Sequence, residues 1–161
     1  SHPAQSELWA RQKSSMLKSL WEDNWRELDK FHQQFLQTIV KNQPMTFLML
    51  LDRKNATTPI DVNYRYQSGW TALHYAAMHS SIQIFSRLIN HPRIDINALT
   101  DFAKPLHIAA KANKLENTLL LLSAGVCIDK RDSDLYTALH YAAELGYRDI
   151  AEALVAHGAS F

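Results

Sequence analysis

A seven-residue pattern recurs three times along the chain at a constant interval. The stretches TALHYAA, KPLHIAA and TALHYAA carry their histidines at positions 74, 107 and 140, so the two successive steps are each 33 residues long. Self-similarity at a fixed period of about 20–50 residues is typical of repeat proteins, in which each unit buries its apolar face against its neighbours. The pattern therefore predicts a stack of similar supersecondary units.

Each copy contains two apolar segments separated by a short polar break. The second segments are IQIFSRLI, LENTLLLL and RDIAEALV, and in the last of them Ile150 and Leu154 recur at helical spacing. Gly125 and Gly158 follow the second and third of these segments, where a left-handed residue ends a helix at low cost, and Pro92 stops the first. The sequence therefore predicts two short helices in every repeat.

Composition and charge narrow the classes of protein to consider. The chain has 161 residues, of which 47% are hydrophobic and 20% charged, which suits one soluble, well-buried domain. A net charge of +1 gives no bulk attraction to nucleic acid or anionic membranes, and no apolar run approaches the roughly 18 residues that span a bilayer. The lone Cys127 excludes an internal disulfide and a four-thiolate zinc site, and it fits a reducing compartment.

The T-x-L-H-x-A-A stretches, the 33-residue step and the terminal HGAS resemble the ankyrin repeat over about residues 66–161. This resemblance implies an all-α, ankyrin-like repeat solenoid, with a β-turn and two antiparallel helices in each repeat. The chain departs from the family pattern at Lys104, where the family prefers threonine. It departs again at Phe102 and Leu135, which stand where the first copy has the turn glycine Gly69. We expect the second and third turns to differ in shape from the first.

The predicted organisation has three parts within a single folded unit. Residues 1–30 form an N-terminal helical cap, residues 31–65 a degenerate ankyrin-like repeat, and residues 66–161 the 33-residue repeats, of which the last is truncated. The degenerate copy contains IDVN, which echoes the later IDIN, and Pro44 suits the first position of a helix. We expect this chain to be a piece of a longer protein.

The N-terminal segment has an apolar stripe that includes Leu17, Trp21 and Trp25. Such a stripe would cover the apolar face that an end repeat exposes. The same tryptophans, together with Lys18 and Arg26, are also compatible with a helix that lies on a membrane surface or binds a partner. The charges of the segment nearly balance, which favours the cap.

The repeated histidines suggest a metal or catalytic site, but stacking argues against it. Successive repeats lie about 10 Å apart, too far for three imidazoles to share an ion at about 2.0–2.1 Å. The resemblance implies instead that each histidine bonds backbone groups and the threonine hydroxyl across its turn, a role that Lys104 cannot fill in the same way. The structural residues that we expect are His74, His107, His140, Thr71 and Thr137.

Partner-binding candidates are the positions that vary while their neighbours repeat, because packing does not dictate them. The predicted turn tips carry one large aromatic residue each, and aromatics are enriched in binding hot spots. The alternative is that Phe102 and Leu135 fold back onto neighbouring turns and replace the missing glycines by local packing. The partner-binding residues that we predict are Trp70, Met78, His79, Phe102, Lys111, Tyr136, Glu144 and Leu145.

These patterns predict a cytoplasmic protein–protein interaction module that binds a partner through its concave face and turn tips. Because no G-x-S-x-G, H-E-x-x-H or P-loop pattern occurs, we expect no enzymatic activity, no metal and no cofactor. We also expect a monomer without nucleic-acid partners or membrane insertion. The alternative function is the substrate-docking or regulatory arm of a longer enzyme or of a secreted bacterial effector, such as a ubiquitin-ligase adaptor acting in the host cytosol.

Overall fold

The computed structural model describes residues 30–52, 60–79, 81–100 and 103–160. The chain divides into two compact units, Ser1–Gln34 and Phe35–Phe161. Residues 30–34, the described part of the first unit, are helical. The predicted N-terminal cap lies almost wholly outside the described residues, so its role stays a prediction. Everything that follows concerns the second unit.

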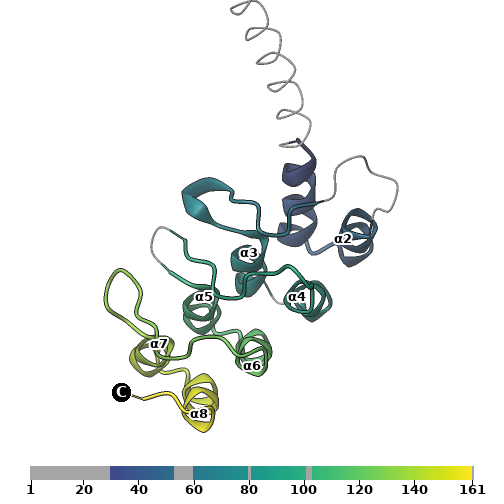
Figure 1. Ribbon diagram of the computed structural model, residues 1–161. Helices are drawn as coiled ribbons and strands as arrows, with labels where there is room; N and C mark the ends of the chain where they lie inside the picture. The colour runs from purple at the N-terminus through teal and green to yellow at the C-terminus, as the bar shows by residue number, and fades with distance from the viewer. Residues whose placement is uncertain (1–29, 53–59, 80, 101–102, 161) are drawn as a thin grey trace, which may run out of the picture. The chain divides into compact units, whose positions relative to one another are not determined.

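The second unit is all-helical in the part of the chain that the structure describes, which confirms the predicted fold class (Figure 1). Residues 35–40 are helical and lead into α2 (Pro44–Leu51), which begins with Pro44 in the first turn as predicted. The later elements are a 3₁₀ turn at Gln67–Gly69, α3 (Ala72–Met78), α4 (Ile82–Ile89), α5 (Pro105–Lys111), α6 (Leu115–Ser123), α7 (Ala138–Leu145) and α8 (Arg148–Ala156).

The helices form two layers. Helices α3, α5 and α7 pack in one row, and α2, α4, α6 and α8 pack in a second row behind it (Figure 1). Each first-row helix also packs against the second-row helix that follows it in the chain, α3 on α4, α5 on α6 and α7 on α8. Each helix pair thus packs against the next pair along the chain, which is the arrangement of a solenoid.

Small residues in the first row let the helices approach each other closely. Ala76, Ala77, Ala109 and Ala110 are buried between α3, α5 and α7. The third alanine pair, Ala142 and Ala143, departs from this pattern, because Ala143 is exposed. Ala143 therefore does not take part in the close approach of the first-row helices.

Larger apolar residues fill the space between the rows. Leu73 on the first row and Phe85 on the second are fully buried, as is Ile150 on α8. At the start of the unit Phe35 and Phe47 stack with ring centroids 5.1 Å apart. Both rings are fully buried, and the degenerate repeat at residues 31–65 stays a prediction.

Side-chain bonds link each inter-repeat loop to the next. Asn63 donates from Nδ2 to the carbonyl of Arg93 at 2.7 Å and accepts the Asp95 N–H at 2.9 Å. One repeat later, Asn97 accepts the N–H of Cys127 at 3.1 Å. These bonds fix the spacing of successive turns, and they explain why the sequence repeats the Asn in IDVN and IDIN.

The turn before α5 differs from the turn before α3, as expected, whereas the turn before α7 has the same length as the turn before α3, which corrects the expectation for the third turn. Backbone bonds from Tyr66 N to Trp70 O and from Asp132 N to Tyr136 O each enclose three residues, whereas the bond from Thr100 N to Ala103 O encloses two. In the three-residue loops the last position is left-handed, with φ +73° at Gly69 and φ +65° at Leu135. Leucine in this conformation is strained.

We expect Leu135→Gly to raise the free energy of unfolding by up to about 1 kcal/mol, because relief of the left-handed strain exceeds the entropy cost of glycine. Little apolar burial is lost, since Leu135 is 66% exposed. Urea denaturation measures the change. The matched control is Leu99→Gly, an exposed leucine without positive φ, which should be neutral or destabilising. Equal destabilisation by both substitutions would show that Leu135 is unstrained.

Candidate binding groove

His74 joins one repeat to the next through both ring nitrogens. Its Nδ1 accepts the Thr71 N–H at 3.0 Å, so the ring proton is on Nε2, which donates to the Ala98 carbonyl at 2.8 Å. Thr71 Oγ1 lies 2.8 Å from the same Nδ1. His74 is fully buried, and burial lowers its pKa to about 4. The imidazole is therefore neutral at pH 7.

His107 repeats this arrangement with backbone partners alone. Its Nδ1 accepts the Lys104 N–H at 3.1 Å, and its Nε2 donates to the Lys130 carbonyl at 2.8 Å. In the third copy His140 Nδ1 accepts the Thr137 N–H at 3.0 Å. Lys104 has no hydroxyl to add, as the sequence comparison indicated. Burial also lowers the pKa of His107, so this ring is held neutral.

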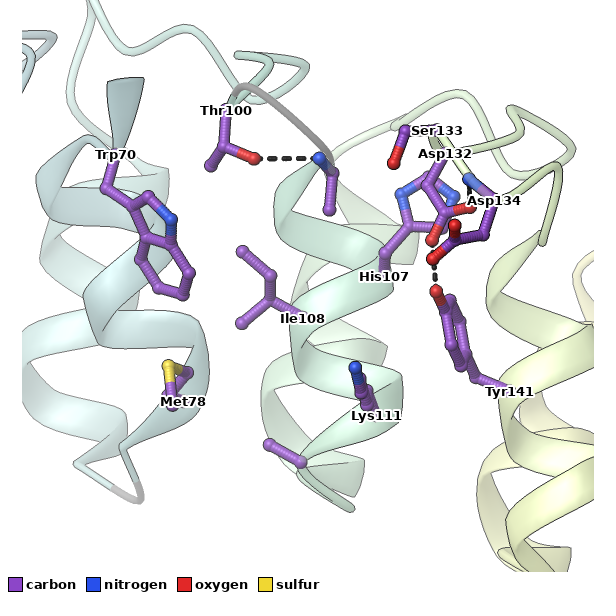
Figure 2. A pocket seen from close by; sticks show the side chains of 12 residues that line it. Trp70, Met78, Thr100, His107, Ile108, Lys111, Asp132, Ser133, Asp134 and Tyr141 are labelled. Atoms are coloured by element: carbon purple, nitrogen blue, oxygen red, sulfur yellow. Dashed lines mark hydrogen bonds between the residues drawn. The ribbon is translucent and has the colours of Figure 1, made fainter. Parts of the chain in front are cut away.

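A hollow beside these histidines has a volume of about 680 Å³, within the range of ligand sites. It opens along α3, α5 and α7, with the turn that precedes α7 at its upper end (Figure 2). Its lining residues are Trp70, Met78, Thr100, Ala103, His107, Ile108, Lys111, Ala112, Asp132, Ser133, Asp134 and Tyr141.

The part of the hollow between α3 and α5 is apolar. Trp70 and Ile108 point toward one another across it, with Met78 below them (Figure 2). Trp70 is half-buried and packs against Tyr75, with ring centroids 5.0 Å apart and a 48° tilt. The aromatic tip residue therefore has a packing role as well as an accessible face, which the comparison of repeats did not reveal.

The part of the hollow between α5 and α7 is polar. Asp132 accepts hydrogen bonds from the backbone N–H groups of Asp134 and Tyr136, at 2.9 and 3.0 Å, and from the Tyr141 hydroxyl. These bonds hold the pKa of Asp132 below its usual value despite the opposing effect of desolvation, so it is ionised at neutral pH. Lys111 lies 5.4 Å from the centre of the Tyr141 ring, in cation–π contact.

Two smaller hollows flank the central one and share residues with it. One, of about 380 Å³, is lined by Val40, Gln67, Ser68, Trp70, Tyr75, Met78 and His79. The other, of about 550 Å³, is lined by Asp134, Leu135, Tyr136, His140, Ala143 and Glu144. Trp70 and Met78 connect the first to the centre, and Asp134 connects the second. We call these three hollows together the groove.

The groove contains most of the predicted partner-binding residues. Those that line it are Trp70, Met78, His79, Lys111, Tyr136 and Glu144. Tyr136 packs against Tyr141 at 5.0 Å, and the neighbouring Glu144 carboxylate raises the pKa of its hydroxyl. Leu145 is 46% exposed on α7 but does not line these hollows. Phe102 lies outside the described residues.

Sequence comparison missed Ile108, Asp132, Asp134 and Tyr141. Ile108 and Tyr141 occupy the x position inside the repeated T-x-L-H-x-A-A pattern, which was not among the predicted binding positions. Asp132 had a recognisable signal, because an aspartate often opens a turn by accepting the N–H two residues further on. The turn places Asp134 on the wall of the groove, which the repeat pattern alone did not indicate.

The groove suits binding better than covalent catalysis. Ser133, His107 and Asp132 lie near one another, which suggests a nucleophile–base–acid set (Figure 2). Both His107 nitrogens are occupied by backbone groups, so the ring cannot accept a serine proton while these bonds persist. Among the described residues no three His, Cys, Asp or Glu side chains form a metal-binding group.

Stacked helix pairs with a groove along the first-row helices define a solenoid repeat protein. A family model described as "Ankyrin repeats (3 copies)" matches residues 8–100 and again residues 99–161, and the chain belongs to the ankyrin-repeat family. Ankyrin repeats are generally protein–protein interaction modules, and the family is typically non-enzymatic. No helix in the described ranges is long and apolar enough to cross a membrane.

The relatives of this chain are large and diverse. It is 35% identical over 91 residues to the tyrosine-protein kinase Shark of Drosophila melanogaster, a match to 55% of this chain and 10% of the kinase. It is 30% identical over 95 residues to the human ankyrin and armadillo repeat-containing protein, covering 56% of this chain and 6% of that protein. It is 36% identical over 98 residues to alpha-latrotoxin-Lg1a of Latrodectus geometricus, covering 59% of this chain and 7% of the toxin. The chain therefore spans a tenth or less of each of these relatives.

Proposed function

We propose that this chain binds a partner protein in the cytoplasm through the groove along α3, α5 and α7. The observation that carries the proposal is the continuity of the three hollows, which share Trp70, Met78 and Asp134. Several lining positions vary between the repeats, so the solenoid itself does not require their side chains. The exposed Cys127 thiol suits a reducing compartment.

The scaffold supports rigid presentation of these side chains. His74 and His107 bond each turn to the next, and Asp132 fixes the turn on which Asp134 stands. A surface that is already ordered loses little conformational entropy when it binds, which improves affinity without additional contacts.

Site-specific photo-crosslinking in cell extract tests the proposal. We expect a benzophenone amino acid at Met78, in the groove, to crosslink one protein, whereas the same amino acid at the exposed Ser123 of α6 should not. Both variants should unfold at the wild-type temperature, because both positions are exposed. A partner captured from Ser123 and not from Met78 would place the binding surface on the second row and exclude the groove.

A second candidate function is a docking or regulatory arm within a longer enzyme. It is supported by the relative named as a tyrosine-protein kinase, of which the matching stretch covers 10%. Immunoprecipitation of the endogenous protein, followed by mass measurement and peptide sequencing, tests this function. A polypeptide with a catalytic motif outside these residues would support it, and a protein made of repeats alone would exclude it.

A further inference from the structure

We propose that the groove binds an extended segment of a partner protein that carries a large apolar side chain and, about three residues away, a lysine or arginine. This inference rests on the proposed function and specifies the chemistry of the partner. It follows from the continuity of the groove, its apolar half and the sign of the charge in its other half.

The shape of the groove fits an extended chain. Its three hollows follow one another along the repeat stack, from Gln67 at one end to Glu144 at the other, and neighbouring hollows share wall residues. A compact ligand would occupy one hollow and leave the others empty. An extended peptide places successive side chains into successive hollows while its backbone runs across the shared walls.

The apolar end of the groove provides an anchor. Trp70 and Ile108 form the two sides of the slot between α3 and α5, and Met78 extends its floor. Met78 is 44% exposed, and its flexible thioether adapts to apolar side chains of different shapes. A large aliphatic or aromatic side chain would remove this apolar surface from water, which is the usual character of a hot spot.

The other end of the groove carries excess negative charge. The lining carboxylates are Asp132, Asp134 and Glu144, and the single lysine in the lining is Lys111. Lys111 already contacts the Tyr141 ring, and His107 is neutral because burial lowers its pKa.

Asp134 is the carboxylate best placed to bind a cation from the partner. The oxygens of Asp132 are taken up by three donors within the protein, whereas Asp134 is exposed on the wall that two hollows share. Within the described ranges the ion pairs lie elsewhere, at Arg87–Asp52 and Arg148–Glu152. A lysine or arginine of the partner would supply the missing positive charge, and arginine would add planar hydrogen bonding.

The repeat spacing sets the distance between the two partner side chains. The apolar slot lies between α3 and α5, and Asp134 belongs to the turn that precedes α7, which is one repeat further along. Neighbouring helices lie about 10 Å apart. An extended chain advances about 3.3 Å per residue, so the apolar and basic side chains are separated by roughly three residues.

Selection from a phage-displayed random dodecapeptide library against the whole 161-residue protein tests this inference. We expect enriched peptides to pair a large apolar residue with lysine or arginine two to four positions away. For a synthetic enriched peptide, fluorescence anisotropy should show binding that Asp134→Asn weakens roughly tenfold, as expected for a charge-assisted contact at a partly exposed site. The matched control, Asp149→Asn on α8, removes an exposed carboxylate outside the groove and should not change affinity.

A charge reversal gives the sharpest test. Asp134→Lys should abolish binding of the basic peptide and restore binding of a peptide whose basic residue is replaced by glutamate. If Met78→Glu abolishes peptide binding but Asp134→Asn leaves it unchanged, the partner does not need a basic residue, and the groove remains the binding site. If no enriched peptide is sensitive to Met78→Glu, the inference and the proposed function are both overturned.

Discussion

We expect Asn117→Asp to lower the free energy of unfolding by about 3–5 kcal/mol, because it leaves a buried carboxylate facing carbonyl oxygens. The Nδ2 group of Asn117 donates to the carbonyl of His79 at 2.8 Å and lies 3.3 and 3.4 Å from those of Ala77 and Ala76. Asn117 is only 2% exposed, so water cannot replace these bonds. Asn117→Ala, which leaves the carbonyls unpaired without adding charge, should cost about 1–3 kcal/mol.

The way α3 ends explains why the stability of the protein depends on the Asn117 side chain. Helices α5 and α7 are closed by left-handed residues, Asn113 with φ +59° and Gly146 with φ +75°, and by backbone bonds from the residue that follows each. Helix α3 is followed by His79 in an extended conformation, and among the described residues after it only the His79 N–H, which donates to the Ala76 carbonyl at 3.1 Å, bonds to the last α3 carbonyls through the backbone. The amide of Asn117, which comes from α6 in the next repeat, caps them as well.

Urea denaturation at pH 7 measures both substitutions. Glu116→Gln is the matched control, because it changes a neighbouring exposed residue of α6 and should alter the free energy of unfolding by less than about 0.5 kcal/mol. Equal stability of Asn117→Asp and Asn117→Ala would show that no acceptor carbonyls face this side chain, and would refute the capping role.

A second large effect is a loss of stability in mild acid. The pKa of His74 is about 4 in the folded protein against 6.5 for an ordinary histidine. Between these values the unfolded chain binds a proton and the folded chain does not, so the free energy of unfolding falls as the pH falls from 6.5 to 4. The shift corresponds to about 3 kcal/mol. Burial lowers the pKa of His107 as well, which adds to the loss in the same direction.

Urea denaturation at pH 7.5, 6.5, 5.5 and 4.5 measures this slope. His74→Gln should be less stable than the wild type at pH 7.5 but should depend less on pH, because the shifted group is gone. His157→Gln replaces an exposed histidine just past α8 and should keep the wild-type slope. Parallel stability curves for the wild type and His74→Gln would show that His74 is not the source of the pH dependence.

The fold was predictable because the same local sequence signals recur in successive repeats. The predicted second helices IQIFSRLI, LENTLLLL and RDIAEALV correspond to α4, α6 and α8 with an end difference of at most one residue. Glycines mark two of their ends, and Pro44 marks a start. Apolar periodicity, helix stops and a constant step all depend on residues close together in the chain.

The groove was only half predictable from the same information. Variation between repeats indicated Trp70, Met78 and Lys111, which do line the central hollow. It missed Ile108, because an apolar residue beside paired alanines looks like core and is 8% exposed. Whether such a residue faces a neighbouring helix or a groove depends on the offset between adjacent repeats, which no single repeat encodes.

The sequence alone determined the repeat and the two helices of each unit, because these follow from short-range spacing. Asn117 shows what tertiary structure decided. It occupies the column in which the other copies have the buried Ile84 and Ile150, so a polar residue there looks like a defect. Only the packing of α6 beside the end of α3 gives it acceptors, because a hydrogen bond depends on the positions of two groups 38 residues apart.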